Sequence, residues 1–181
     1  MIKPAGLKSE ANIGVISPSY WIAEDVLKNT SEIFSSRNFH LTFGKSIMAK
    51  EGPFAGPPEL RAEDLNNMFA DPNIDAIFCA RGGYGANRVL PLLNYDMIKE
   101  NPKIFIGYSD ITAYLTSITQ KTEIITFHGP MLVSYKHGFI DYNFDQMMKA
   151  LTRTENIVIS TPEEFDPHIL KKGNAKGPLW G

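Results

Sequence analysis

Short apolar runs alternate with longer amphipathic runs along residues 11–131, and this alternation constrains the fold more than any other feature of the sequence. Short apolar runs are typical of buried strands, and apolar residues spaced three or four apart are typical of helices. Alternation of the two favours βαβ units, which place the strands in a parallel sheet. We therefore predict an α/β fold with a mainly parallel sheet flanked by helices.

The expected elements follow from these runs. Strands are expected at residues 11–17, 38–43, 74–79, 103–108 and 123–127. Helices are expected at residues 22–36, 59–69, 86–93, 110–120 and 144–151, with a turn at 96–100. The pattern weakens after Pro130, and a new element is expected to begin at 157–160. We predict an N-terminal domain at 1–135, a connecting segment at 136–160 and the truncated beginning of a second domain at 161–181.

The composition is that of a globular protein, with 43% hydrophobic and 21% charged residues in a chain of 181 residues. A formal net charge of -2 gives no electrostatic reason to expect nucleic acid or an anionic membrane as a partner. The sequence contains neither a secretory signal nor a stretch able to span a bilayer, and the expected location is the cytoplasm. The lone cysteine, Cys79, lies in an apolar run and is expected to be a buried small hydrophobe.

Ser109 stands at the junction between the strand expected at 103–108 and the helix expected at 110–120. A serine on such a turn projects from the sheet edge, and the first free N–H groups of the helix can hold a developing oxyanion. The usual G-x-S-x-G sequence is incomplete, because Gly107 is present but Ile111 occupies the second glycine position. The alternative is that Ser109 or Asp110 only caps the helix, since both residue types favour that position.

Unusual residues follow several of the expected strands. They are Ser17-Pro18-Ser19, Arg81-Gly82-Gly83-Tyr84-Gly85, Ser109-Asp110 and His128-Gly129-Pro130. Ligands of open parallel sheets bind outside the carboxyl ends of the strands. If the sheet is parallel, these segments share one rim, and we expect the functional site there.

The segment Gly82-Gly83-Tyr84-Gly85, here called the glycine loop, allows close approach of the backbone and positive φ angles. One interpretation is a dinucleotide-binding loop, but the last glycine of G-x-G-x-x-G is missing. Another is a tight turn without function. The interpretation that we favour is an oxyanion hole, in which an N–H of this loop joins that of Asp110 at a carbonyl attacked by Ser109.

Two charged or titratable side chains lie near these motifs. Arg81 either binds a carboxylate through a bidentate contact or is a solvated charge. His128 is either the general base that a serine nucleophile needs or a histidine that fixes the turn before Pro130. The other histidines, His40, His137 and His168, lack ligand-like spacing, so a metal site is not expected.

Taken together, these motifs resemble the N-terminal half of an LD-carboxypeptidase. The matching segments are Ser17-Pro18-Ser19, Ala80-Arg81-Gly82-Gly83-Tyr84-Gly85, Gly107-Tyr108-Ser109-Asp110-Ile111-Thr112 and Thr126-Phe127-His128-Gly129-Pro130-Met131. The family comprises serine peptidases and includes the murein tetrapeptide carboxypeptidases and the microcin C self-immunity peptidases. The Arg-Gly-Gly-Tyr-Gly loop and His-Gly-Pro favour the murein branch.

The resemblance implies a cytoplasmic hydrolase that removes a terminal D-alanine from peptidoglycan-derived tetrapeptides during cell-wall recycling, without a cofactor. It implies a fold like that of class I glutamine amidotransferases, with a smaller C-terminal domain closing the cleft. Ser109 would be the nucleophile, and the N–H groups of Gly83 and Asp110 would form the oxyanion hole. The expected substrate-binding residues on the same motifs are Ser17, Arg81, Tyr84 and His128.

The sequence departs from the family in its triad of Ser, Glu and His. The family's Glu and His come from the second domain, and no residue here matches them. A serine without a base is a poor nucleophile, since losing a triad member removes several orders of magnitude of rate. The alternatives are therefore a non-catalytic remnant that binds a peptide or muropeptide, or an immunity peptidase of the microcin C type. A homodimer or a complementary C-terminal half is a further expected partner.

Overall fold

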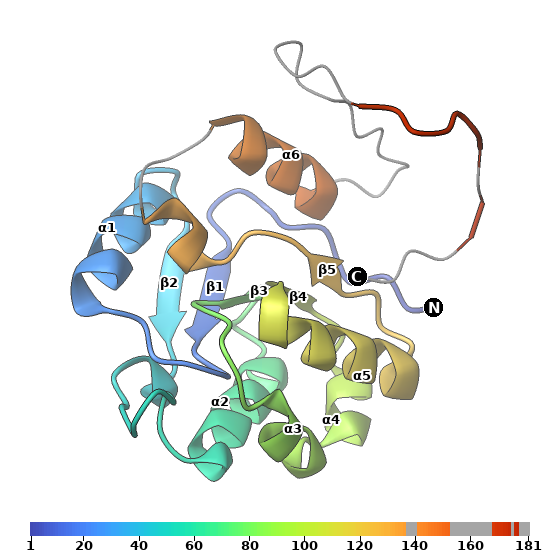
Figure 1. The fold of residues 1–181 in the computed structure, drawn as a ribbon. Coiled ribbons are helices and arrows are strands. Elements are labelled where there is room, and N and C mark those ends of the chain that lie inside the picture. Colours follow the sequence, from blue (N-terminus) through green and yellow to red (C-terminus); the bar gives the residue numbers. More distant parts are fainter. Residues whose placement is uncertain (137–140, 153–167, 175, 178–181) are drawn as a thin grey trace.

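The computed structural model of the protein describes residues 1–136, 141–152, 168–174 and 176–177. In this part of the chain a five-stranded parallel sheet has the order β2-β1-β3-β4-β5 (Figure 1). The strands are β1 (Asn12–Ile16), β2 (His40–Phe43), β3 (Ala76–Cys79), β4 (Ile104–Gly107) and β5 (Phe127–His128). The predicted α/β fold with a mainly parallel sheet is confirmed.

Helices cover both faces of the sheet (Figure 1). They are α1 (Glu24–Ser35), α2 (Pro58–Ala70), α3 (Ala86–Val89), α4 (Tyr95–Glu100), α5 (Thr112–Thr122) and α6 (Asp141–Thr152). The core on one face joins side chains of α2 to α5 to the sheet, whereas the core on the other face contains Phe34 of α1 and Phe144 of α6. The central strands β3 and β4 are buried along their whole length, as expected for a parallel sheet covered on both sides.

Two elements differ from the sequence prediction. The helix expected at 86–93 is the short α3 followed by a 3₁₀ turn, Leu90–Leu92, because Pro91 lacks the N–H that an α-helix needs there. The strand expected at 123–127 shrinks to β5. Glu123 ends α5 in a left-handed conformation with φ 64°, so it cannot begin a strand.

The N-terminal segment makes backbone hydrogen bonds to the end of α5 and to α6, which are distant in the sequence. The N–H of Ile2 donates to the carbonyl of Glu123, and the N–H of Leu7 donates to the carbonyl of Leu151 at 2.8 Å. Leu151 is buried in the same core as Leu7. The helix predicted near 144–151 is thus present and packs on the sheet domain. The predicted boundary at residue 135 stays a prediction.

Several expectations lie outside the described residues. They are the new element expected at 157–160, most of the connecting segment after residue 152, and residues 161–167, 175 and 178–181 of the expected second domain. Cys79 is fully buried, and burial raises the pKa of its thiol, which confirms the expectation of a buried small hydrophobe.

Candidate active site

The loops that follow β1, β3, β4 and β5 meet at one edge of the sheet, because these strands are parallel and adjacent (Figure 1). The N–H of Tyr20, after β1, donates to the carbonyl of Gly82, after β3, at 3.2 Å. The hydroxyl of Ser19 donates to the carboxylate of Asp110, after β4, at 2.6 Å. The prediction that these segments share a rim is confirmed.

Ser109 adopts a left-handed backbone conformation with φ 64°. The extended Tyr108 precedes it, and a 3₁₀ turn, Ser109–Ile111, leads into α5. A non-glycine residue in this conformation costs of order 1–3 kcal/mol and persists only where the surrounding structure imposes it. Such strain is typical of functional positions, and the Ser109 side chain is exposed at the tip of the turn.

Neither Ser109 nor Asp110 caps the 3₁₀ turn or α5. The residues at the N-cap positions of the 3₁₀ turn and of α5 are Tyr108 and Ile111, and neither makes a side-chain cap bond. The carboxylate of Asp110 instead accepts hydrogen bonds from Ser19 and from the N–H of Ala86. The capping interpretation is therefore wrong.

Gly107 makes the tight turn possible although the second glycine of the usual motif is absent. A Cβ on Gly107 would lie 2.6 Å from Cγ2 of Ile111 and 3.0 Å from its Cβ. Ile111 itself is fully buried. The missing side chain at residue 107 thus accommodates the isoleucine that replaces a glycine at 111.

The glycine loop packs directly against the turn that carries the serine. A Cβ on Gly82 would lie 3.0 Å from Cβ of Ser109 and 3.2 Å from its Oγ. Gly83 has φ 134°, and a Cβ there would overlap the ring of Tyr20. This close approach is what an oxyanion hole between the loop and Asp110 requires, and the hole itself stays a prediction.

The predicted binding residues take different positions at the rim. Arg81 is half-buried; its guanidinium donates to the carbonyl of Trp21 at 3.3 Å and lies over the ring of Tyr20. Tyr84 is 60% exposed at the tip of the glycine loop. Ser17 is fully buried, and its hydroxyl has no hydrogen-bond partner among the described residues.

The sequence did not reveal the support beneath the rim. The carbonyl of Pro18 accepts hydrogen bonds from Arg61 Nη1 at 3.0 Å and from the Tyr114 hydroxyl at 2.7 Å. Burial lowers the pKa of the Arg61 guanidinium, and Tyr114 and the Asp110 carboxylate oppose this shift. Burial also raises the pKa of Tyr114. One signal was available, since Arg61 precedes Leu65 by one helical turn on the buried face of α2.

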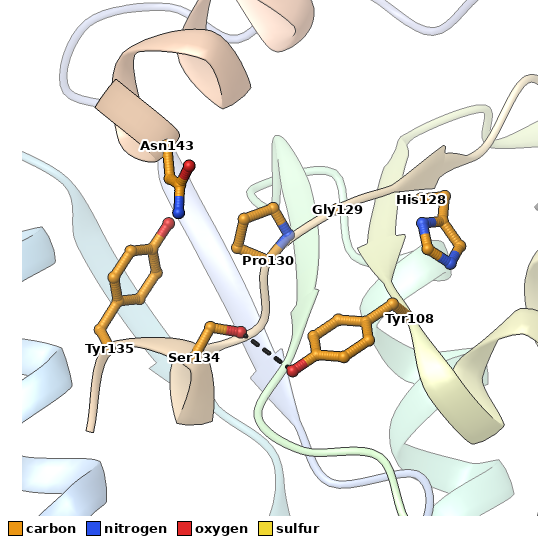
Figure 2. Close-up of a pocket in the computed structure, with 7 residues that line it drawn as sticks. All are labelled: Tyr108, His128, Gly129, Pro130, Ser134, Tyr135 and Asn143. Atoms are coloured by element: carbon orange, nitrogen blue, oxygen red, sulfur yellow. Dashed lines mark hydrogen bonds between the residues drawn. The ribbon is translucent and has the colours of Figure 1, made fainter. Parts of the chain in front are cut away.

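Beside the turn lies a pocket of about 310 Å³ (Figure 2). Its lining residues are Tyr108, His128, Gly129, Pro130, Ser134, Tyr135 and Asn143. The Ser134 hydroxyl lies 3.5 Å from that of Tyr108, and the rings of Tyr108 and His128 are 6.2 Å apart. Of these residues, only His128 was predicted from the sequence as a site residue. The one sequence feature that could have indicated this pocket is Tyr108, because it directly precedes Ser109.

The structure does not pair His128 with Ser109. His128 is exposed at the end of β5. Among the described residues, no histidine or carboxylate makes a hydrogen bond to the Ser109 hydroxyl. A serine nucleophile needs a base within hydrogen-bond reach, so within the described contacts the catalytic set is incomplete.

The described residues contain no group of three or more His, Cys, Asp or Glu side chains placed to hold a metal ion. No helix in the described ranges is long and apolar enough to cross a membrane.

Comparison with known proteins adds three findings. The family model of the LD-carboxypeptidase N-terminal domain matches residues 13–129. The "probable murein peptide carboxypeptidase" of Bacillus subtilis strain 168 is 32% identical over 99% of this chain and 56% of its own length. The microcin C7 self-immunity protein of Escherichia coli is 38% identical over 69% of this chain and 37% of its own length.

Solved structures give the same picture. The microcin C7 self-immunity protein in complex with aspartyl sulfamoyl adenosine aligns with a TM-score of 0.86 at 33% identity, covering 90% of this chain and 51% of that one. Muramoyltetrapeptide carboxypeptidase of Oxalobacter formigenes shares the fold, with a TM-score of 0.72 at 22% identity, over 79% of this chain and 48% of that one. The chain thus spans about half the length of these relatives.

Proposed function

The chain belongs to the LD-carboxypeptidase family, and on that premise we propose that it is the nucleophile-bearing part of a cytoplasmic serine carboxypeptidase. Its proposed substrates are peptidoglycan-derived tetrapeptides, from which a terminal D-alanine is released. The observation that carries the proposal is the strained, exposed Ser109 between β4 and α5, in contact with the glycine loop.

In the proposed reaction the Ser109 hydroxyl attacks the carbonyl of the last peptide bond. The N–H groups of Gly83 and Asp110 stabilise the negative charge on the carbonyl oxygen. A base takes the serine proton and returns it to the departing amine of D-alanine, leaving an acyl-enzyme that water hydrolyses. The Glu and His of the family triad are proposed to come from the domain that follows this one in the relatives.

Substrate binding is proposed for the predicted rim residues. Arg81 would bind the terminal carboxylate, as its guanidinium is half-buried at the start of the glycine loop. Tyr84 and His128 are exposed on the two sides of the rim and would contact the peptide. Ser17 is buried and cannot contact the peptide directly, so it would influence binding by positioning the loop that follows β1.

The test is D-alanine release from a murein tetrapeptide by the chain joined to the remaining half of the Bacillus subtilis relative. We expect Ser109→Ala to abolish release and Ser35→Ala, an exposed serine on α1, to leave it unchanged. Unaltered release by Ser109→Ala contradicts the proposal. The same assay on the chain alone measures the rate that this part retains without the added domain.

A non-catalytic binding role is the second candidate, favoured by the absence of a base at Ser109 among the described contacts. It predicts saturable muropeptide binding by the chain, with no D-alanine released even when the second half is supplied. The likeness to the microcin C7 self-immunity protein favours a third outcome. An immunity peptidase of that type would bind aspartyl sulfamoyl adenosine, as in the complex of that relative, and would release no D-alanine from the tetrapeptide.

A further inference from the structure

The side chain and the backbone N–H of Asp110 make different interactions. Its N–H is assigned to the oxyanion hole, whereas its carboxylate lies between two other loops of the rim. Oδ2 accepts the Ser19 hydroxyl at 2.6 Å and the N–H of Ala86 at 3.1 Å. Ser19 follows β1 and Ala86 follows the glycine loop, so one carboxylate oxygen joins three of the loops at the rim.

These bonds fasten the far end of the glycine loop. Its near end is held by the N–H of Tyr20, which donates to the carbonyl of Gly82 at 3.2 Å. Ala86 comes immediately after Gly85, whose φ of 112° marks a sharp bend in the backbone. Gly83, Tyr84 and Gly85 lie between these two fixed points, and Gly82 at the near end packs against Ser109.

The segment that carries Ser19 is itself held in place. Ser19 is fully buried, and its neighbour Pro18 is held through its carbonyl by Arg61 and Tyr114. Hydrogen bonds to an ionised carboxylate are stronger than neutral ones, especially where water is largely excluded. Loss of the Asp110 carboxylate would therefore free the glycine loop while the sheet beneath stays in place.

We infer that the Asp110 carboxylate is a positioning group, which holds the glycine loop against Ser109 through Ser19 and Ala86 and so aligns the N–H groups of Gly83 and Asp110. This inference rests on the proposed function for the purpose of the alignment. Whether the Asp110 carboxylate holds the glycine loop in place does not depend on the proposed function, and it can be measured without any catalytic reaction.

The test compares Asp110→Asn with the parent chain, and Asp75→Asn serves as the matched control. Asp75 also accepts a backbone N–H, that of Asn12 at 2.8 Å, but at the opposite end of the sheet. The first measurement is amide hydrogen exchange of residues 82–86. We expect exchange to quicken by about tenfold in Asp110→Asn, because the bonds from Ser19 and Ala86 to a charged oxygen are replaced by weaker bonds to a neutral amide oxygen. In the control it should stay unchanged.

The second measurement separates positioning from general support. A peptidyl boronic acid forms a tetrahedral adduct with a serine hydroxyl and so uses the oxyanion hole, whereas the matching peptide carboxylate does not. We expect Asp110→Asn to weaken binding of the boronic acid about tenfold or more and binding of the peptide less than about twofold. Equal weakening of both overturns the positioning role.

Unchanged loop exchange in Asp110→Asn overturns the inference. Should that variant fail to fold, Ser19→Ala takes its place, since it removes one of the two bonds and keeps the carboxylate; unchanged loop exchange there is equally contradictory. If the parent chain does not bind the boronic acid, the proposed function fails. Hydrogen exchange alone then shows whether the Asp110 carboxylate holds the glycine loop in place.

Discussion

The turn after β4 depends on a residue without a side chain, Gly107, as much as on Ser109. Ile111 fills the space that a Cβ at residue 107 would need. The strained φ of Ser109 is therefore compatible with an isoleucine where related turns carry a glycine. Whether a serine between a strand and a helix projects from the sheet therefore depends on the local backbone geometry and not on a complete G-x-S-x-G sequence.

Substitution of Gly107 by Ala tests this dependence. The added methyl would lie 2.6 Å from Cγ2 of the buried Ile111, so the turn must shift. We expect a loss of about 1–3 kcal/mol in the free energy of unfolding, measured by urea denaturation. Gly173→Ala is the control, because nothing lies within 4 Å of a Cβ there. Equal stability of the two variants contradicts the account of the turn.

Single residues were predictable where sequence and backbone geometry are directly linked. Ser109 was identified from a strand-to-helix junction and the glycine loop from a cluster of glycines, and each of these patterns is visible in a short stretch of sequence. Arg61 and Tyr114 were not, since their shared contact with Pro18 joins segments 43 and 96 positions apart. The direction of the Asp110 carboxylate likewise depends on tertiary contacts.

Among the elements, α6 has the clearest structural role outside the rim. Its buried side chains, Phe144, Met147 and Leu151, pack with Phe34 of α1 on one face of the sheet. Asn143 of the same helix lines the pocket beside Tyr108 (Figure 2). The helix thus completes the core and forms one wall of that pocket.

Phe144→Ala tests the contribution of α6 to the core. The ring of Phe144 lies 5.8 Å from that of Phe34 in an edge-on arrangement, and its removal leaves a cavity. We expect the free energy of unfolding to fall by about 3–5 kcal/mol in chemical denaturation. The exposed Asp145 on the same helix provides the control, and Asp145→Ala should change stability little. A Phe144→Ala variant as stable as this control would show that α6 is not part of the core.

The strands were predictable at this scale because buried parallel strands are continuous apolar runs, as in Ile104–Gly107. The end of α5 was not, because the left-handed Glu123 is recognisable only from the backbone. The pairing of Ile2 with Ile124 was equally invisible, since it joins opposite ends of the sheet domain.

For the whole molecule, residues 1–152 account for both described cores. The chain spans about half the length of its relatives, and the base proposed for Ser109 lies beyond the described contacts. The described residues 168–172 are exposed, and Gly173 and Gly177 have no neighbouring atoms within 4 Å of a Cβ position.

Removal of residues 153–181 is therefore expected to leave the domain folded. Its melting temperature, measured by circular dichroism, should match that of the full chain within about 2–4 °C, because both described cores lie within residues 1–152. A large decrease would contradict this expectation and would show that residues 153–181 stabilise the domain.

A crystal structure of the chain with a peptidyl boronic acid tests the central claim most directly. We predict a covalent bond between boron and Oγ of Ser109. One boronate oxygen should lie about 2.7–3.1 Å from the backbone nitrogens of Gly83 and Asp110. Boron bound to another residue, or an oxygen directed away from these N–H groups, would contradict the assignment of nucleophile and oxyanion hole.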